Sequence, residues 1–186
     1  TPARIEADLS RLQFYTDCLR VYTPVGDAPR VVEAAEARGM KVLLGAWIGS
    51  NLEQNDREIA AALALARAHP RTVRAIVVGN EVLLRREMSI ARLAALIREV
   101  REASPVPVAY ADVAHFIDEA PAVAEAADIL MIHVLPYWDE PAPPPAEAAV
   151  AQVFKVYDKF IARWPGRTVM VGETGWPSAG RQRGPG

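Results

Sequence analysis

Short apolar runs alternate with amphipathic stretches along almost all of this 186-residue chain. Six of the runs have the length and composition of β-strands, and they begin near residues 19, 41, 73, 107, 129 and 168. The average spacing of about 30 residues is that of a strand–helix–strand unit. Because the runs are apolar throughout, both faces of the sheet should be covered, which indicates parallel strands flanked by helices.

The stretches between these runs carry the signals of helix ends. Ser89 is placed to cap one helix, and Asn55 with Glu58 resembles the capping box that opens another. We therefore expect helices over residues 3–12, 30–38, 55–69, 89–102, 117–126 and 147–164.

Composition narrows the class of protein. Hydrophobic residues make up 51% and charged residues 24% of the chain, which suits one globular domain with a substantial core. The formal net charge is −2 and the strand-like runs are not interleaved with Lys or Arg, so we expect no nucleic-acid partner. No apolar run reaches the roughly 18 residues of a membrane-spanning helix, so we expect no membrane contact by this segment. Cys18 is the single cysteine, and we expect it to be a small buried residue.

Spacing alone leaves two folds open, a doubly wound open sheet and a (β/α)8 barrel. No Gly-rich phosphate loop follows the first strand, which disfavours a nucleotide-binding open sheet. An open sheet gathers its site at one crevice, whereas a barrel draws on the carboxyl ends of all its strands. Polar or aromatic residues stand at the ends of most predicted strands: Tyr22, Trp47, Asn80, Glu81, Tyr110, Asp112, His133 and Glu173. This distribution favours the barrel.

The strand count falls short of a whole barrel, with six strands rather than eight in a chain shorter than the ~250 residues typical of the fold. We predict a single α/β domain over residues 1–186, a TIM-type (β/α)8 barrel that is incomplete at both ends. One strand is expected before residue 1 and one beyond residue 186, so that strands two to seven are visible. The exposed edges of such a sheet would favour association with another copy.

Two glutamates end apolar runs in similar settings. Residues 74–81 end in Gly-Asn-Glu, and residues 168–178 contain Gly-Glu-Thr-Gly-Trp-Pro-Ser. Cleavage of a glycosidic bond needs one carboxyl group that protonates the leaving oxygen and another that attacks or activates water. A glutamate after a strand is usually only solvated, but here Asn80 can hydrogen-bond a sugar hydroxyl and the indole of Trp176 can stack on a pyranose ring. Glu81 and Glu173 together therefore predict a glycosidase site at one mouth of the barrel.

These motifs resemble those of glycoside hydrolase family 17, the β-1,3-glucanase family. Two further stretches, Leu44-Gly-Ala-Trp-Ile48 and His133-Val-Leu-Pro-Tyr-Trp138, resemble a bacterial branch of that family whose members are often joined to membrane-embedded glucan synthases. The resemblance runs over nearly the whole chain and departs from the family pattern at the two ends.

The resemblance implies a retaining glycoside hydrolase that cleaves β-1,3-glucan through a covalent glycosyl-enzyme intermediate. Glu173 would be the nucleophile, Glu81 the acid/base and Asn80 the partner of the sugar 2-hydroxyl. Asp112 is equally a helix cap or a sugar ligand, and His133 is expected to be a satisfied barrel histidine. No cofactor and no metal site are expected. Aromatic side chains are candidate substrate contacts, with packing in a loop or inside the barrel as the alternative: Tyr22, Trp47, Tyr137, Trp138 and Trp176.

Two alternatives to the hydrolase stay open. A β-1,3-glucanosyltransferase of glucan synthesis or remodelling would share the covalent intermediate and transfer it to a sugar instead of water. An inactive glucan-binding or structural partial barrel is the alternative of another class. The resemblance also suggests a bacterial periplasmic or membrane-associated location, with a membrane anchor elsewhere in the full-length protein.

Overall fold

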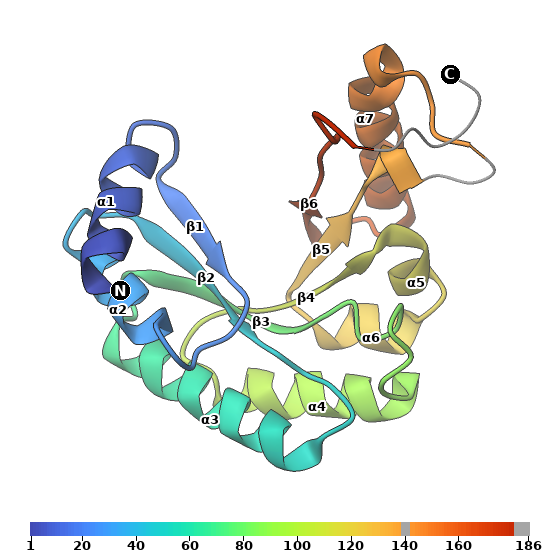
Figure 1. Ribbon diagram of the computed structural model, residues 1–186. Coiled ribbons are helices and arrows are strands. Elements are labelled where there is room, and N and C mark those ends of the chain that lie inside the picture. The colour runs from blue at the N-terminus through green and yellow to red at the C-terminus, as the bar shows by residue number, and fades with distance from the viewer. Residues whose placement is uncertain (139–141, 181–186) are drawn as a thin grey trace.

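A computed structural model describes residues 1–138 and 142–180 of the chain. Its centre is a six-stranded sheet in the order β1-β2-β3-β4-β5-β6, in which every neighbouring pair is parallel. The sheet curls into part of a barrel with helices along its outer side (Figure 1). The strands are β1 Cys18–Val21, β2 Lys41–Ala46, β3 Val73–Asn80, β4 Val108–Val113, β5 Ile129–His133 and β6 Thr168–Glu173.

Strand order follows chain order without a reversal, so the sheet has no switch point of the doubly wound kind. This arrangement confirms a parallel α/β sheet of the TIM-barrel type, while the numbering of its strands as two to seven stays a prediction. The helices are α1 Pro2–Leu12, α2 Ala28–Glu36, α3 Leu52–Ala68, α4 Ile90–Ala103, α5 Ala114–Asp118, α6 Pro121–Ala126 and α7 Ala146–Arg163, with a 3-10 turn η1 at Pro136–Trp138.

The expected start of the helix after β2 was wrong. Helix α3 begins at Leu52, three residues earlier than expected, because the side chain of Asn51 accepts a hydrogen bond from Gln54 N–H and caps it. The expected capping-box residues, Asn55 and Glu58, are instead buried within the first two turns of the helix. Their side chains bond to loops at the carboxyl end of the sheet, as described below.

The two faces of the sheet carry different side chains, as the period of two along a strand requires. Larger residues face the helices and build the main core, among them Ile76, Val78 and Tyr110. Smaller or flexible residues face the inside of the curve in a second cluster made of Val77, Ala109, Ala111 and Met131.

Bulges in two strands change which side chains face inward. Val77 pairs with Ala109 but Asn80 pairs with Ala111, so β3 holds one residue more than β4 over this step. Strand β6 likewise gains one residue between the partners of Ile132 and His133. A bulge bends a strand and redirects the side chains beyond it. Asn80, which alternation would place on the helix side, and Glu173 both point into the curve of the sheet as a result.

Strands β1 and β6 are the edges of the sheet within the described residues. Near β6, helix α7 leaves Val150 and Phe154 more than 60% exposed. No helix among the described residues has both the length and the apolar character to cross a membrane.

Candidate active site

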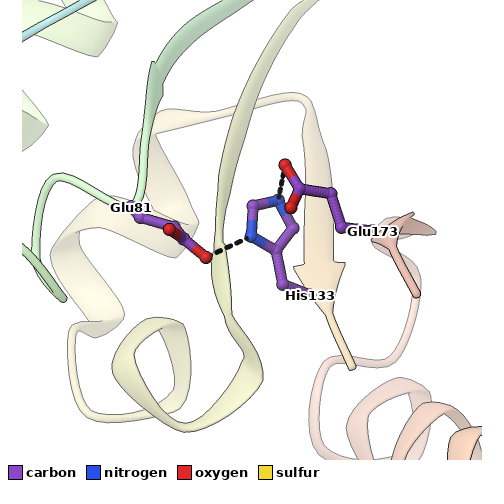
Figure 2. Close-up of side chains that lie close together, drawn as sticks. All are labelled: Glu81, His133 and Glu173. Carbon is purple, nitrogen blue, oxygen red and sulfur yellow. Dashed lines mark hydrogen bonds and ion pairs between the residues drawn. The ribbon is translucent and has the colours of Figure 1, made fainter. Parts of the chain in front are cut away.

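Glu81, His133 and Glu173 meet at the carboxyl ends of β3, β5 and β6, with the imidazole between the two carboxyl groups (Figure 2). His133 Nδ1 is 2.8 Å from Glu81 Oε1, and His133 Nε2 is 3.5 Å from Glu173 Oε1. One carboxylate oxygen of each glutamate and one imidazole nitrogen all lie within 4.8 Å of one another. The structure therefore places the two glutamates singled out from the sequence at one mouth of the sheet. His133 is 1% exposed and bonded, as expected of a barrel histidine.

Arg20 on β1 connects the site across the open curve of the sheet. Its Nη1 donates to Glu173 Oε1 at 3.1 Å and to the Gly172 carbonyl at 3.1 Å, and its Nη2 donates to Asn80 Oδ1 at 2.5 Å. Only 13% of this side chain is exposed, so water screens these contacts weakly. Sequence reasoning missed Arg20. A signal was present, because Arg20 stands two residues before Tyr22 and therefore on the same face of the chain.

The contacts that the described residues make to the Glu173 carboxylate all fall on Oε1. Arg20 donates to this atom, and the Tyr22 hydroxyl donates to it at 3.0 Å. Burial, and then the hydrogen bond to Glu173, raise the pKa of Tyr22, so its hydroxyl keeps its proton at neutral pH. Within the described part of the chain, none of these contacts falls on Oε2.

His133 contacts both glutamates and Arg20 through its ring nitrogens. Its Nδ1 lies 2.8 Å from Glu81 Oε1, and its Nε2 lies 3.4 Å from Arg20 Nη1 and 3.5 Å from Glu173 Oε1. Arg20 can only donate and a carboxylate can only accept, so the two contacts of Nε2 require opposite roles and do not assign the proton to one nitrogen.

The indole of Trp47 lies beside Arg85, whose guanidinium carbon is 4.6 Å from the ring centroid. Arg85 also donates to the backbone carbonyl of Asn80, so Trp47 is connected to the site through this arginine rather than by direct contact. Glu58 accepts hydrogen bonds from the backbone N–H of Trp47 and from the Thr23 hydroxyl, and so holds the ends of β1 and β2 together.

Three further aromatic candidates gather beyond β5 and β6. The ring of Tyr137 makes edge-on contacts with Trp138 and Trp176, at centroid distances of 5.3 and 5.4 Å. Trp138 is 62% exposed and lines a pocket of about 730 Å³ to which Glu81 and His133 also contribute. The pocket lies between α5 and α7 and is largely apolar, which suits the face of a sugar ring.

Glu81, His133 and Glu173 are also the donor types that hold metal ions, and among the described residues they form the one such group. Arg20 places a positive guanidinium 3.1 Å from the Glu173 oxygen in this group. A cation would be repelled there at close range. We therefore keep the expectation of a metal-free site.

Two other expectations can be compared with the structure. Cys18 is exposed, so the prediction of a buried cysteine was wrong. Asp112 is fully buried and accepts hydrogen bonds from Val113 N–H and Leu83 N–H. It is therefore neither exposed to sugar nor the N-cap of α5, which is Val113.

Comparisons with known proteins agree with this geometry. The family model described as the BtgE/BtgC glycoside hydrolase domain matches residues 1–186. The glucan 1,3-beta-glucosidase BGL2 of Candida albicans is 26% identical over 200 residues, which cover 96% of this chain and 64% of that protein. A glucan 1,3-beta-glucosidase of Saccharomyces cerevisiae is 26% identical, with 94% of this chain and 62% of that protein covered. This chain thus spans somewhat less than two thirds of these relatives.

A solved structure is similar over the same region. The glycoside hydrolase family 17 beta-1,3-glucanosyltransferase from Rhizomucor miehei superposes with a TM-score of 0.86 at 30% identity, covering 97% of this chain and 68% of that one. An active-site mutant of the Rhizomucor miehei enzyme in complex with laminaritriose gives a TM-score of 0.85 at 31% identity. These relatives are fungal, so they support the family and not the bacterial branch expected from the sequence.

Proposed function

Since this chain belongs to the BtgE/BtgC glycoside hydrolase domain family, within glycoside hydrolase family 17, we propose that it cleaves β-1,3-glucan with retention of configuration. The observation that carries the proposal is the approach of the two glutamates to within 4.8 Å through their carboxylate oxygens. Retaining enzymes hold their two carboxyl groups about 5–5.5 Å apart, whereas inverting enzymes leave about 6.5–9.5 Å for a water molecule.

In the first step, Glu173 Oε2 attacks the anomeric carbon while Glu81 transfers a proton to the departing glycosidic oxygen. Arg20 and Tyr22 hold Oε1 of the nucleophile, which leaves Oε2 to form the bond. Arg20 donates to the amide oxygen of Asn80, the side chain that we propose as the partner of the sugar 2-hydroxyl. This step leaves the sugar esterified to Glu173 and Glu81 ionised.

In the second step, Glu81 removes a proton from the incoming acceptor, and the acceptor oxygen displaces Glu173 from the anomeric carbon. Both glutamates return to their starting states. His133 touches both carboxyl groups and is buried, so it can hold their spacing through the two steps.

The acceptor decides between hydrolysis and transfer. A water acceptor gives the glucanase, and a sugar acceptor gives a glucanosyltransferase of glucan synthesis or remodelling. The transferase is favoured by one specific observation: the Rhizomucor miehei neighbour at 30% identity is a beta-1,3-glucanosyltransferase. The exposed indole of Trp138 lines the same pocket as Glu81, which supports our proposal that it stacks on an acceptor sugar.

The aromatic contacts to glucan by Trp47, Tyr137, Trp138 and Trp176 are inferred from their positions near the site. The bacterial branch indicated by the sequence motifs is not proposed, because the relatives found are fungal. An inactive, glucan-binding partial barrel stays the alternative of another class, because this chain spans 64% of the BGL2 relative.

Product analysis on a reduced β-1,3-glucan oligosaccharide tests the proposal. Hydrolysis yields only shorter oligosaccharides by mass, whereas transfer also yields products longer than the substrate. The full-length protein is assayed beside its Glu173→Ala and Glu81→Ala variants. Absence of both product classes from the wild type, with the substrate still bound, would favour the glucan-binding alternative.

A further inference from the structure

The backbone at Glu81 is in an unusual conformation. Its φ angle is +55°, in the left-handed region that residues with a side chain rarely adopt. Such a conformation is energetically unfavourable and persists where the surrounding structure holds it. Its N–H donates to the Ala111 carbonyl at 2.8 Å, and its carbonyl accepts from Arg85 N–H at 2.8 Å. Beyond these contacts, the turn is anchored on its far side through Leu83 N–H.

Asp112 supplies that anchor from the neighbouring strand β4. Its Oδ2 accepts a hydrogen bond from Leu83 N–H at 3.1 Å, two residues beyond Glu81, and the Tyr110 hydroxyl accepts a longer bond from the same N–H at 3.3 Å. The Tyr110 hydroxyl donates to Oδ2 of Asp112 at 2.5 Å, and Val113 N–H donates to Oδ1 at 2.8 Å. Burial raises the pKa of the Tyr110 phenol, which therefore stays a donor.

Tyr110 and Asp112 cannot act on the substrate directly. Tyr110 belongs to the core cluster on the helix side of the sheet, and Asp112 follows it at a spacing of two. Both are fully buried, whereas the neighbouring Ala111 faces the inside of the curve. Burial of a carboxylate away from water is unfavourable unless hydrogen-bond donors around it compensate, as Tyr110 and the two backbone N–H groups do here.

We propose that Asp112, itself held by Tyr110, is a positioning residue for the Glu81 carboxyl group. By binding Leu83 N–H, it fixes the turn whose first residue carries the acid/base, and so sets where the proton is delivered. The inference rests on the role of Glu81 proposed above. Arg85 holds the other flank of the same turn through the Asn80 carbonyl.

The test compares aryl β-laminaribiosides that carry a good or a poor leaving group, hydrolysed by the full-length protein. A misplaced acid slows departure of a poor leaving group, which needs a proton, more than departure of a good one. We expect Asp112→Asn, which keeps the side-chain volume, to lower kcat/KM about tenfold or more on the poor leaving group and about threefold or less on the good one. Tyr110→Phe should act in the same direction, less strongly.

Asp128→Asn is the matched control. Asp128 also accepts a backbone N–H of strand β4, from Val108 at 2.9 Å, but at the opposite end of the strand. Its removal should leave the leaving-group dependence unchanged. As a readout that needs no activity, hydrogen exchange at the Leu83 amide should accelerate in Asp112→Ala, while exchange at Ile76 in the centre of β3 stays slow.

Equal losses on both substrates in Asp112→Asn, or no loss, would overturn the inference while leaving the role of Glu81 intact. Unchanged protection of the Leu83 amide in Asp112→Ala would also overturn it. Glu81→Ala is measured in parallel, since its own failure to discriminate between leaving groups would overturn the proposed acid/base role and this inference with it.

Discussion

Arg20 is the residue whose loss should damage the site most without removing a reacting group. Besides its bond to the Gly172 carbonyl, it donates one hydrogen bond to the Glu173 carboxylate and one to the Asn80 amide oxygen, the two groups proposed to act on the substrate. A hydrogen bond to a charged group contributes about 1.5–3 kcal/mol. Arg20→Met removes both, so the loss is about 3–6 kcal/mol, or roughly 10²- to 10⁴-fold in kcat/KM if it falls on the transition state. Arg20→Lys can keep one bond but cannot span both acceptors, so its loss should be about 10- to 100-fold.

The assay is kcat/KM on a β-1,3-glucan oligosaccharide, with the melting temperature measured for each variant. Arg38→Met is the matched control, because Arg38 is 17% exposed, compared with 13% for Arg20, and bonds to Glu6 away from the site. The control should keep wild-type activity. A folded Arg20→Met variant within about fivefold of wild type, or an equal loss in Arg38→Met, would refute the reasoning.

Three further changes test separate parts of the account. Glu173→Ala should abolish turnover because no intermediate can form, and azide should restore cleavage of an activated β-glucoside with the α-azide as product, detected by NMR; a β-azide would contradict the nucleophile assignment. Gly172→Ala would bring a Cβ to 3.0 Å from His133 Cδ2, so we expect the imidazole to shift and kcat to fall about tenfold or more, measured beside the melting temperature; unchanged kcat would show that the imidazole position is not critical. The hydrogen bond with His69 is the main reason that the pKa of Glu36 lies below 4.5. The stabilisation of the fold by ionised Glu36 is therefore complete above pH 4.5 and is lost as the pH falls through the lowered pKa. The melting temperatures of wild type and Glu36→Gln should therefore differ at neutral pH and converge in acid, and a constant difference would contradict the assignment.

The sheet and its two glutamates were predictable because they depend on local pattern. Apolar runs at regular spacing determine parallel strands, and residues that follow such strands meet at one edge of the sheet. Glu81 and Glu173 were placed correctly on that basis, although they are far apart in the sequence. Helix ends were less predictable, since Asn51 rather than Asn55 caps α3 through its side chain.

The supporting residues were not predictable by the same reasoning. Arg20 bonds to groups 60 to 153 positions away, and these partners are known only once the sheet is assembled. The bulges in β3 and β6 add one residue each and reverse the alternation that a sequence pattern assumes. Asp112, which followed a strand like the other candidates, faces the helices because β4 has no bulge before it. Position at a strand end thus predicted a site residue only where the strand geometry also turned the side chain inward.

In the proposed mechanism, Glu173 forms the covalent intermediate, and Glu81 first donates a proton to the leaving oxygen and then removes one from the acceptor. A 2-deoxy-2-fluoro-β-laminaribiosyl fluoride slows the breakdown of such an intermediate, so the labelled protein can be digested and its peptides sequenced by mass spectrometry. We predict a single fluorosugar on Glu173, formed in wild type and absent from Glu173→Ala. A label on Glu81, or no label in a protein that turns over β-1,3-glucan, would contradict the account.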